Sequence, residues 1–391
     1  MRARFIHSIH DIPSSLWNQL CGVDYPFLRH EFFTALEDSK STTRATGWEP
    51  HHLLVEDESD GKEDNKILLV MPLFLKHHSY GEYVFDWSWA DAYQRHGEDY
   101  YPKLLNAIPF TPATGPRWGL IEAAKNDEAL SHSILAFAFE AIEKEAKVNN
   151  FSSSHYLFTN KASDPYFKST SYSKRTGCQY HWLNDDYSSF EDFLSRFNSR
   201  KRKNLKKERQ KVSEQNIQLV IKESSSITDE DWQSFYLFYH MTYFKRSGRQ
   251  GYLSESFFPL LTTLLHEHLM MVQSVKEGEV IAAALYFKDS RTLYGRYWGC
   301  KEEYDQLHFE ACYYQGIEYA IKNKLQKFDP GAQGEHKIQR GFTPTETYSY
   351  HWINHPQFNE AIERFVRTEE KEIKEYIKLA SERLPFKSVD P

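Results

Sequence analysis

The chain has 391 residues and a formal net charge of −7 at pH 7, with 40% hydrophobic and 16% aromatic residues. This composition excludes an intrinsically disordered chain, which is poor in aromatic residues. The negative charge argues against a protein that coats nucleic acid through its overall charge, although a local basic patch is compatible with such binding. The length favours two or three hydrophobic cores over one.

The four cysteines are too few for a disulfide framework, and none of them forms a C-x-x-C motif. The N-terminal residues lack the apolar stretch of a secretory signal. The longest apolar run, Ile67–Leu75, contains Pro72 and is shorter than the roughly 20 residues that a membrane helix needs. We therefore expect reduced thiols, no membrane span and a cytoplasmic location.

Hydrophobic periodicity and turn residues predict the elements of the first half. In chain order we expect helix Arg29–Asp38, strands His52–Glu56 and Ile67–Leu75 joined by a polar loop at Asp57–Lys66, strand Glu82–Trp87, helices Asp99–Ala107 and Asp127–Val148, and strands His155–Phe158 and Gln179–Leu183. The apolar face of the longer helix is the clearest of these signals.

The second half predicts a similar plan. In chain order we expect a helical stretch Ser188–Glu214, strand Gln218–Ile221, helices Asp229–Phe244 and Glu255–His266, strands Leu269–Val275, Val280–Phe287 and Thr292–Trp298, helix Asp305–Lys324, strands Gln326–Asp329 and Thr347–Trp352, and helix Phe358–Ala380. Short polar turns between the three consecutive strands predict an antiparallel meander. We therefore predict an α/β fold with mixed sheets and two similar units, residues 1–186 and 187–391.

A glycine-rich segment, Gly331–Phe342, follows a predicted strand and is the first candidate for chemistry. Glu335 and His336 offer an acid or base, and Lys337 and Arg340 offer cations for an anionic substrate. Loops after strands are common positions for functional sites. The alternative is a polar surface loop interrupted by glycines.

The second candidate is the segment Asp86–His96. Asp86 and Asp91 lie in the sequence beside Trp87 and Tyr93, so we expect desolvation to raise the pKa of these carboxyl groups. Aromatic walls with a few polar groups are typical of a small-ligand pocket. The alternative is that the aromatic rings pack in the core and the aspartates cap a turn.

The third candidate is His308 and Glu310, which together with Glu335 and His336 resemble part of a metal-ligand set. The H-x-E spacing does not place both side chains on one helical face, and the chain has no H-E-x-x-H motif. We therefore expect no metal, and a hydrogen-bonding role for His308 and Glu310 near the pocket.

The fourth candidate is a basic stretch over residues 196–211, within a predicted helix. We expect Arg200, Lys201, Arg202 and Lys203 to bind phosphate, either of nucleic acid or of acyl-carrier phosphopantetheine. The alternative is a solvated helix face. The chain has no G-x-S-x-G elbow, Walker loop or G-x-G-x-x-G motif, which weighs against serine hydrolases, P-loop kinases and nicotinamide dehydrogenases.

Five blocks of sequence resemble a known family. The blocks Phe85–Tyr93, Tyr100–Leu105, Pro109–Arg117 and Gly331–Phe342 are similar to signature segments of the predicted N-acyltransferases, which resemble the Fem peptidoglycan-bridge enzymes and belong to the wider GNAT group. The block Ser199–Glu208 resembles the basic helix that opens the second unit of Fem-like proteins. The resemblance implies tandem GNAT-like units, a cytosolic location and N-acyl transfer.

The sequence departs from the GNAT pattern where acetyl-CoA users carry an R/Q-x-x-G-x-G/A turn. Here that position contains Gly299–Asp305, with two glutamates and no glycine pair. Such a turn repels a pyrophosphate that a helix N-terminus would otherwise hold. The donor implied by the resemblance is an acyl-CoA or an aminoacyl-tRNA, with no permanently bound cofactor, and the departure weakens the acyl-CoA reading.

The favoured hypothesis is therefore transfer of an acyl or aminoacyl group to a small-molecule or peptide amine, at a site between the two halves. We expect Glu335 or His336 to be the base, with Asp86 as the alternative. We also expect anion or oxyanion contacts from Arg117, Lys337 and Arg340, and pocket walls formed by Trp87, Tyr93 and Tyr297. The alternative hypothesis is a binding protein that recognises tRNA or a cell-wall precursor without catalysis, and a metal hydrolase is a distant third.

Overall fold

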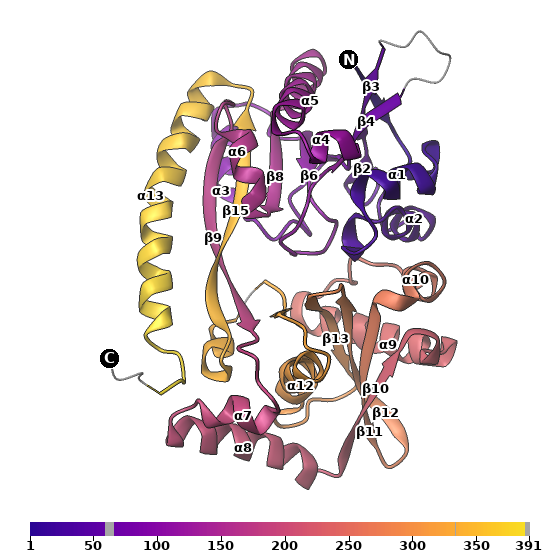
Figure 1. The fold of residues 1–391 in the computed structure, drawn as a ribbon, viewed down its shortest axis with the longest axis vertical. Helices are drawn as coiled ribbons and strands as arrows, with labels where there is room; N and C mark the ends of the chain where they lie inside the picture. Colours follow the sequence, from indigo (N-terminus) through magenta and orange to yellow (C-terminus); the bar gives the residue numbers. More distant parts are fainter. Residues whose placement is uncertain (59–65, 333, 388–391) are drawn as a thin grey trace. The chain divides into compact units, whose positions relative to one another are not determined.

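The computed structural model describes residues 1–58, 66–332 and 334–387 (Figure 1). The chain divides into two compact units, one formed by Met1–Gly177 with Glu346–Lys374, the other by Cys178–Thr345 with Glu375–Pro391. The chain passes from one unit to the other within β9 (Ser173–Leu183), β15 (Thr343–Ile353) and α13 (Pro356–Ser381). Whether 1–186 and 187–391 are the two GNAT-like repeats stays a prediction. Most of the predicted loop Asp57–Lys66 lies outside the described residues.

The first unit contains most of the N-terminal elements. In chain order they are β1 (Arg2–Ile6), α1 (Ser14–Cys21), α2 (His30–Asp38), β2 (Trp48–Pro50), β3 (His52–Asp57), β4 (Lys66–Met71), β5 (Phe74–Lys76), α3 (Trp87–Arg95), β6 (Lys103–Asn106), β7 (Gly119–Leu120), α4 (Glu122–Lys125), α5 (Glu128–Val148), β8 (Ser153–Thr159) and α6 (Asp164–Phe167). One sheet has the order β1-β3-β4-β7, and a run of strands has the order β15-β8-β6-β5-β2.

The helix α5 confirms the clearest prediction for this half. Its N-terminus is capped by Asp127, whose carboxylate accepts a hydrogen bond from the backbone N–H of Leu130. Ile134, Leu135, Phe139 and the other apolar residues of one face are buried in the core of the first unit. This helix packs against β3 and β8, and β8 carries His155 of the second candidate site described below.

Three predictions for the first half are wrong in detail. Pro72 has no N–H for the ladder, and the predicted strand Ile67–Leu75 is divided there into β4 and β5. The predicted helix Asp99–Ala107 contains the strand β6, which lies between β5 and β8 and is buried along its whole length, so its sequence shows no alternation. The predicted strand Glu82–Trp87 is irregular and leads into α3, whose first hydrogen bonds go from Trp89 and Ala90 to the carbonyl of Asp86.

The second unit contains the meander that the sequence predicted. Its elements in chain order are α7 (Phe190–Ser195), α8 (Ser199–Glu214), β10 (Ile217–Glu223), α9 (Asp229–Ser247), α10 (Phe257–Leu265), β11 (Leu269–Lys276), β12 (Glu279–Lys288), β13 (Thr292–Cys300), α11 (Leu307–Phe309), a π-helix (Glu310–Tyr314), α12 (Gln315–Lys322), β14 (Lys327–Asp329) and a 3-10 helix (Glu335–Arg340). The strand order in this unit is β10-β11-β12-β13-β14-β9. The strands β10 to β13 are antiparallel neighbours, which confirms the meander.

The predicted helical stretch Ser188–Glu214 consists of two capped helices. Ser189 accepts a hydrogen bond from the N–H of Asp192 at the start of α7, and Asn198 accepts one from the N–H of Lys201 at the start of α8. The predicted helix Asp305–Lys324 is interrupted by the π-helix, and such a widened turn is often found at functional sites.

Glycines allow helices to pack closely against β13 and β14. A Cβ atom on Gly299 would lie 2.1 Å from the backbone carbon of Phe238, so α9 is able to lie directly against this strand. On α12, a Cβ atom on Gly316 would lie 2.6 Å from the ring of Phe328. These contacts fix the elements around the carboxyl end of β14. Among the described residues, no helix combines the length and the apolar run that crossing a membrane takes.

Candidate functional site

In the second unit, two parallel strands separate at the point where polar residues gather. Thr292–Tyr294 of β13 pair with Lys327–Asp329 of β14, where β14 ends, while β13 continues to Cys300. Ligands of open α/β sheets commonly bind beyond the carboxyl ends of such strands. We call the polar residues at this position the strand-end site: His181, Arg296, Asp329, Gly331 and Lys337.

A buried ion pair forms the base of the strand-end site. The Nη2 atom of Arg296 lies 2.9 Å from the Oδ2 atom of Asp329, and the two side chains are 1% and 0% exposed. Burial by itself would raise the pKa of Asp329, but Arg296 and the nearby imidazole of His181 hold it well below its ordinary value. The same carboxylate accepts a hydrogen bond of 3.0 Å from the N–H of Gly331. Asp329 thus fixes the start of the glycine-rich segment.

Lys337 is the residue of this site that titrates closest to neutral pH. Its side chain is 2% exposed, and its ammonium donates a hydrogen bond of 2.7 Å to the carbonyl of Gly331. Burial lowers the pKa of Lys337 to about 8; Asp329 opposes this shift and Arg296 adds to it. A lysine with such a pKa exchanges a proton readily near neutrality, as general acid–base chemistry requires.

Two neutral histidines lie beside the strand-end site. The hydroxyl of Tyr313 lies 2.9 Å from the Nε2 atom of His336, and the His308 and His336 ring centroids are 6.4 Å apart. Burial, with the nearby cations Arg340 and Lys337, lowers the pKa of His336 to about 4. Burial lowers the pKa of His308 to about 3. Both rings are therefore uncharged at neutral pH and act as hydrogen-bonding groups.

Arg340 uses all its nitrogens to hold the 3-10 helix that carries Lys337. It donates to the hydroxyl of Tyr314 (2.9 Å), to the carbonyl of His336 (2.8 Å) and to the carboxylate of Glu208 (2.8 Å). Its guanidinium also lies 3.5 Å from the centroid of the Phe309 ring. The geometry therefore favours a positioning role for Arg340 over the predicted anion contact.

The remaining predicted residues of the second unit contact groups other than Lys337. Glu335 is exposed and accepts a hydrogen bond of 2.7 Å from the hydroxyl of Tyr376. Glu310 is buried but faces Arg209, which donates to both of its oxygens. Tyr297 packs edge-on against the ring of Tyr239. Among the described residues, no group of three or more His, Cys, Asp or Glu side chains is arranged to hold a metal ion.

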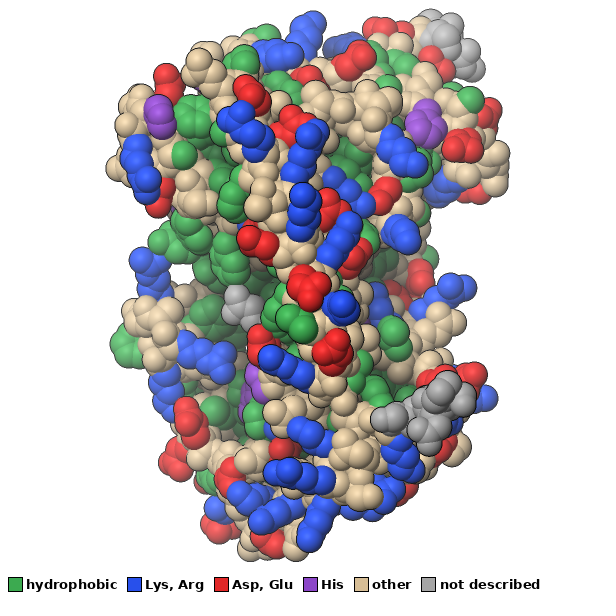
Figure 2. Space-filling view, turned by 90° about the vertical axis from the view of Figure 1, so that its left-hand side faces the viewer, with side chains coloured by type: hydrophobic (Ala, Val, Ile, Leu, Met, Phe, Trp, Pro, Cys, Tyr) green, Lys and Arg blue, Asp and Glu red, His purple; other side chains and the backbone are tan. Residues whose placement is uncertain are grey.

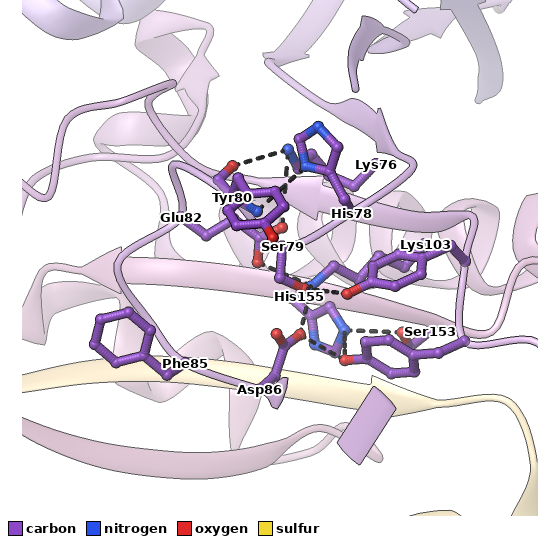
Figure 3. Close-up of polar contacts among 12 residues, drawn as sticks. Lys76, His78, Ser79, Tyr80, Glu82, Phe85, Asp86, Lys103, Ser153 and His155 are labelled. Atoms are coloured by element: carbon purple, nitrogen blue, oxygen red, sulfur yellow. Dashed lines mark hydrogen bonds and ion pairs between the residues drawn. The ribbon is translucent and has the colours of Figure 1, made fainter. Parts of the chain in front are cut away.

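The first unit contains a second polar group, which we call the Lys103 cluster: Lys76, Glu82, Asp86, Tyr100, Lys103 and His155 (Figure 3). Every one of these side chains is buried. The ammonium of Lys103 donates to Glu82 at 2.8 Å and also to Asp86, whose carboxylate accepts a further hydrogen bond of 2.7 Å from Tyr100. The segment Glu82–Asp86 is irregular because its two carboxylates turn inward to this lysine.

The electrostatics of this cluster correct one prediction. Burial raises the pKa of Glu82 to about 7 in spite of Lys103. Burial also acts to raise the pKa of Asp86, but the contact with Lys103 and the proximity of His155 lower it to about 2. The expectation of a raised pKa for Asp86 is therefore wrong, because the counter-charge on β6 outweighs desolvation.

A chain of hydrogen bonds continues from this cluster across the sheet. The Nε2 atom of His155 lies 3.2 Å from the hydroxyl of Tyr100, and its Nδ1 atom lies 2.8 Å from the Nδ1 atom of His351. His155 and His351 are opposite each other on β8 and β15. Lys103 and His155 were not predicted from the sequence; the available signal was an isolated lysine or histidine within a short apolar run.

The other residues predicted in the first unit lie outside this cluster. Trp87 is 39% exposed, and Asp91 is exposed on α3. Tyr93 is buried and stacks on Phe358, with ring centroids 4.0 Å apart. Arg117 is fully buried and donates to three backbone carbonyls, those of Leu157 (2.6 Å), Pro116 (2.8 Å) and Ala113 (2.6 Å). Its contacts are those of a structural residue.

Comparison with known families agrees with this architecture. A family model, FemAB-like, described as peptidoglycan biosynthesis/recognition, matches residues 8–388. The chain belongs to the FemAB-like family. A crystal structure of FemX is similar to this FemAB-like chain with a TM-score of 0.51 at 11% identity, covering 93% of this chain and 100% of FemX. The predicted fold, α/β with GNAT-like units of the Fem type, is thereby confirmed.

Two further solved structures are similar at lower scores. A tandem GNAT protein from the clavulanic acid biosynthesis pathway has a TM-score of 0.43 at 8% identity, covering 91% of this chain and 99% of that protein. The L-PGS of Bacillus licheniformis has a TM-score of 0.46 at 9% identity, covering 86% and 95%. A search of curated protein sequences finds no match. Family membership supports the predicted coarse class, a transferase of peptidoglycan biosynthesis or recognition.

The GNAT fold implies coenzyme A as a donor, and the residues of this FemAB-like chain do not fit it. The turn after β13 has Glu302, Glu303 and Asp305 exposed at the start of the following helix. The lysine in this turn, Lys301, lies 3.6 Å from Glu279, and Asp305 pairs with Lys211 at 2.6 Å. Three carboxylates at this position disfavour a pyrophosphate at the helix N-terminus.

The predicted phosphate-binding residues lie at the start of α8. Arg200 and Lys203 are exposed, and Lys201 and Arg202 are half-buried. The lower part of Figure 2, where α7 and α8 lie, shows many Lys and Arg side chains. The structure thus places these residues on the surface of the second unit, in line with either a solvated face or a phosphate-binding one.

Proposed function

We propose that this FemAB-like chain transfers an acyl or aminoacyl group from an ester-linked donor to an amine acceptor at the strand-end site. The observation that carries the proposal is Lys337, a buried lysine with a pKa of about 8 beyond the carboxyl end of β14. The ion pair between Arg296 and Asp329 keeps the surrounding backbone in place. Preorganised donors of this kind are a common source of stabilisation in acyl transfer.

In the proposed reaction the neutral acceptor amine attacks the carbonyl carbon of the donor ester. A C–N bond forms, and the carbonyl oxygen becomes an oxyanion that accepts a hydrogen bond from the ammonium of Lys337. When the C–O bond breaks, Lys337 gives its proton to the leaving oxygen and takes one from the attacking nitrogen. The products are an amide and an alcohol, and Lys337 ends in its starting state.

The residues around Lys337 support this assignment better than the acids and bases predicted from the sequence. His336 is uncharged at neutral pH, but with a pKa of about 4 it is a weak base. Glu335 is exposed and bonded to Tyr376. We therefore propose His336, through its contact with Tyr313, as a hydrogen-bonding group for substrate, and Lys337 as the proton carrier.

We further propose an aminoacyl-tRNA as donor and a peptide or small-molecule amine of a peptidoglycan precursor as acceptor. The acidic turn Glu302–Asp305 disfavours acyl-CoA, and the basic start of α8 is suited to the phosphates of an RNA-linked donor. The family description, peptidoglycan biosynthesis/recognition, supports the choice of acceptor.

The test compares wild type with Lys337→Met and Lys337→Arg. Release of deacylated RNA or free coenzyme A is followed across a panel of aminoacyl-tRNAs and acyl-CoAs, each with an amine acceptor. We expect turnover with an aminoacyl-tRNA and a loss of at least about 10²-fold in both variants, because arginine keeps the charge but does not titrate near neutrality. Unchanged turnover in both variants would overturn the assignment of the reaction to the strand-end site. Binding of a precursor or tRNA without any turnover would favour the non-catalytic alternative, which the word recognition in the family description also allows.

A further inference from the structure

The helix α8 has two faces of different chemistry. Arg200, Lys203 and Lys207 recur at three- and four-residue spacing and are exposed along one face. Leu205 and Val212 are buried on the opposite face. A charged, solvent-exposed face opposite an apolar face is ordinary for a surface helix. A function for α8 is therefore indicated only by the contacts that each face makes.

The exposed cations have no counter-charge within the described residues. No carboxylate of the described chain lies within salt-bridge distance of Arg200, Lys203 or Lys207. In contrast, Lys206 and Lys211 on the same helix are paired, with Glu191 (2.7 Å) and with Asp305 (2.6 Å). Three cations without an ion pair in the described chain, in line over eight residues, a rise of about 10 Å along the helix, suit a chain of phosphates.

The chemistry of this face favours a nucleic acid over a membrane. A helix that docks on a lipid surface exposes large apolar side chains on the face that meets the lipid. On α8 the large apolar residues are Leu205 and Val212, and both face inward. Phosphodiester binding needs only the cations.

The inner face of α8 holds two elements of the strand-end region. The carboxylate of Glu208 accepts hydrogen bonds from Arg340 (2.8 Å) and from the hydroxyl of Tyr314. The next residue, Arg209, donates to the two oxygens of Glu310, at 3.0 and 2.8 Å. Glu310 and Tyr314 are the first and last residues of the π-helix. Two successive residues of α8 therefore hold this π-helix and the 3-10 helix of the site.

Lys337 belongs to the turn that Glu208 holds. Arg340 donates a hydrogen bond of 2.8 Å to the carbonyl of His336, the residue that precedes Lys337. Tyr313 of the π-helix contacts the same histidine at 2.9 Å. The position of the Lys337 backbone is thus linked to α8 through Arg340 on one side and the π-helix on the other.

We propose that α8 couples the binding of an RNA strand on Arg200, Lys203 and Lys207 to the order of the strand-end site, with Glu208 as the positioning residue. Its consequence for catalysis rests on the proposed function, but the coupling itself does not. Because linkage is reciprocal, a ligand that orders α8 orders the turn that α8 holds, provided that Glu208 keeps its contacts. Without Glu208 the RNA still binds, but the site does not respond.

The experiment is hydrogen exchange of the full chain with and without a 12-nucleotide polyuridylate, measured by mass spectrometry. In wild type we expect salt-sensitive binding and slower exchange in peptides that cover residues 308–316 and 335–342. In the triple variant Arg200→Glu, Lys203→Glu, Lys207→Glu we expect affinity at least tenfold lower. In Glu208→Gln we expect an affinity for the oligonucleotide within twofold of wild type, and no slowing of hydrogen exchange in those peptides.

A matched control and a second variant keep the result interpretable. Glu191→Gln removes one carboxylate from an exposed pair with Lys206 and should respond like wild type. Tyr314→Phe removes the hydroxyl between Glu208 and Arg340 and should weaken the response even where Glu208→Gln is poorly folded. Slowing that persists in both Glu208→Gln and Tyr314→Phe overturns the coupling. Binding to anionic phospholipid vesicles in place of the oligonucleotide overturns the choice of partner.

The exchange measurement needs neither donor nor acceptor, so it separates the coupling from the proposed function. Loss of turnover in Lys337→Met with no exchange response in wild type supports the function and overturns the coupling. Slower exchange on RNA binding without turnover on any donor supports the coupling and contradicts the proposed function. Where turnover is measured, Glu208→Gln should lower kcat and leave KM for the RNA-linked donor within twofold.

Discussion

Lys76 and Lys103 lie directly opposite each other on the antiparallel strands β5 and β6, and both side chains are fully buried. Like charges in this arrangement destabilise a sheet unless counter-charges offset them. Lys103 has such partners in Glu82 and Asp86, and together they raise its pKa although burial acts to lower it. Lys76 lies 3.9 Å from Glu82 and 3.8 Å from the centroid of the Trp48 ring, and burial lowers its pKa well below the ordinary value.

We therefore expect the two lysines to respond differently to substitution. Lys103→Met leaves two buried carboxylates without their cation and should lower the free energy of unfolding by about 3–5 kcal/mol. Lys76→Met removes a buried amine that has one poor ion pair, and should cost less than about 1 kcal/mol. Denaturant unfolding of both variants, followed by tryptophan fluorescence, checks the difference. Equal losses would show that Lys76 carries a buried charge that Glu82 neutralises.

The carboxyl group of Glu82 predicts a pH dependence of stability. Its pKa rises on folding from 4.5 to about 7, so between these values the folded state binds more protons than the unfolded state. Stability therefore falls as pH rises through this window, by up to about 3 kcal/mol. Asp86, with a folded pKa of about 2, contributes in a separate window, where its stabilising effect is lost as pH falls below about 4.

Unfolding of wild type and Glu82→Gln, measured at intervals from pH 4.5 to 7.5, tests this sign. The difference in free energy between the variant and wild type should shift in favour of the variant as pH rises. A difference that is independent of pH would mean that Glu82 keeps an ordinary pKa in the folded protein. Glu140→Gln, the same change at an exposed surface carboxyl, is a suitable control.

These groups also show which features the sequence was able to predict. The helix α5 has clear helical periodicity, and the strands β11 to β13 are separated by short polar turns; the prediction of these elements was confirmed. β6 was predicted as a helix, because a strand buried between two neighbours has no alternation to distinguish it. Strands buried on both faces were predicted where short polar turns bound them, as for β11 and β12, and β6 was missed because no such turns mark its ends.

The residues of the two candidate sites also differ in whether the sequence could predict them. Lys337 was recognised because its glycine-rich segment follows a strand, and that is a local signal. Lys103 was missed, since its partners Glu82 and Asp86 are 21 and 17 residues away and meet it only in the folded unit. The predicted direction of the pKa shift of Asp86 was wrong for the same reason. The sequence showed the tryptophans beside it but not the lysine on the next strand.

Lys337 should lower the free energy of unfolding, although the proposed reaction depends on it. Its pKa falls on folding from 10.5 to about 8, so between these values the unfolded state binds more protons and stability rises with pH. At pH 7 the buried ammonium costs on the order of 3 kcal/mol, partly offset by its hydrogen bond to Gly331. Lys337→Met should therefore raise the melting temperature at pH 7 and abolish transfer.

The pKa of Lys337 also predicts how kcat changes at alkaline pH. If the protonated amine of Lys337 donates to the oxyanion, kcat should fall as pH rises through about 8. The melting temperatures of wild type and Lys337→Met, compared at pH 7 and pH 10, should converge at the higher pH, where the wild-type lysine is neutral when folded. A variant that is less stable than wild type at pH 7 would argue that the ammonium is well solvated.

Arg117 provides the sharpest contrast between a structural and a functional reading of a predicted site residue. Its Nε, Nη1 and Nη2 atoms donate to the carbonyls of Leu157, Pro116 and Ala113, and its side chain is among the largest that are fully buried. A lysine at this position keeps the charge but supplies one nitrogen in place of a planar fork. Arg117→Lys should therefore leave carbonyls unpaired and lower the free energy of unfolding by about 2–4 kcal/mol.

Turnover per folded molecule should be unchanged in Arg117→Lys, since the donors of Arg117 face backbone carbonyls. Arg364→Lys is the matched control, because Arg364 is 69% exposed and forms an i,i+4 pair with Glu360; it should change stability by less than about 0.5 kcal/mol. The opposite result in Arg117→Lys, full stability with at least tenfold lower turnover, would restore the predicted oxyanion contact. It would also require that Arg117 release a carbonyl when substrate binds, which faster exchange at the N–H groups around Leu157 would reveal.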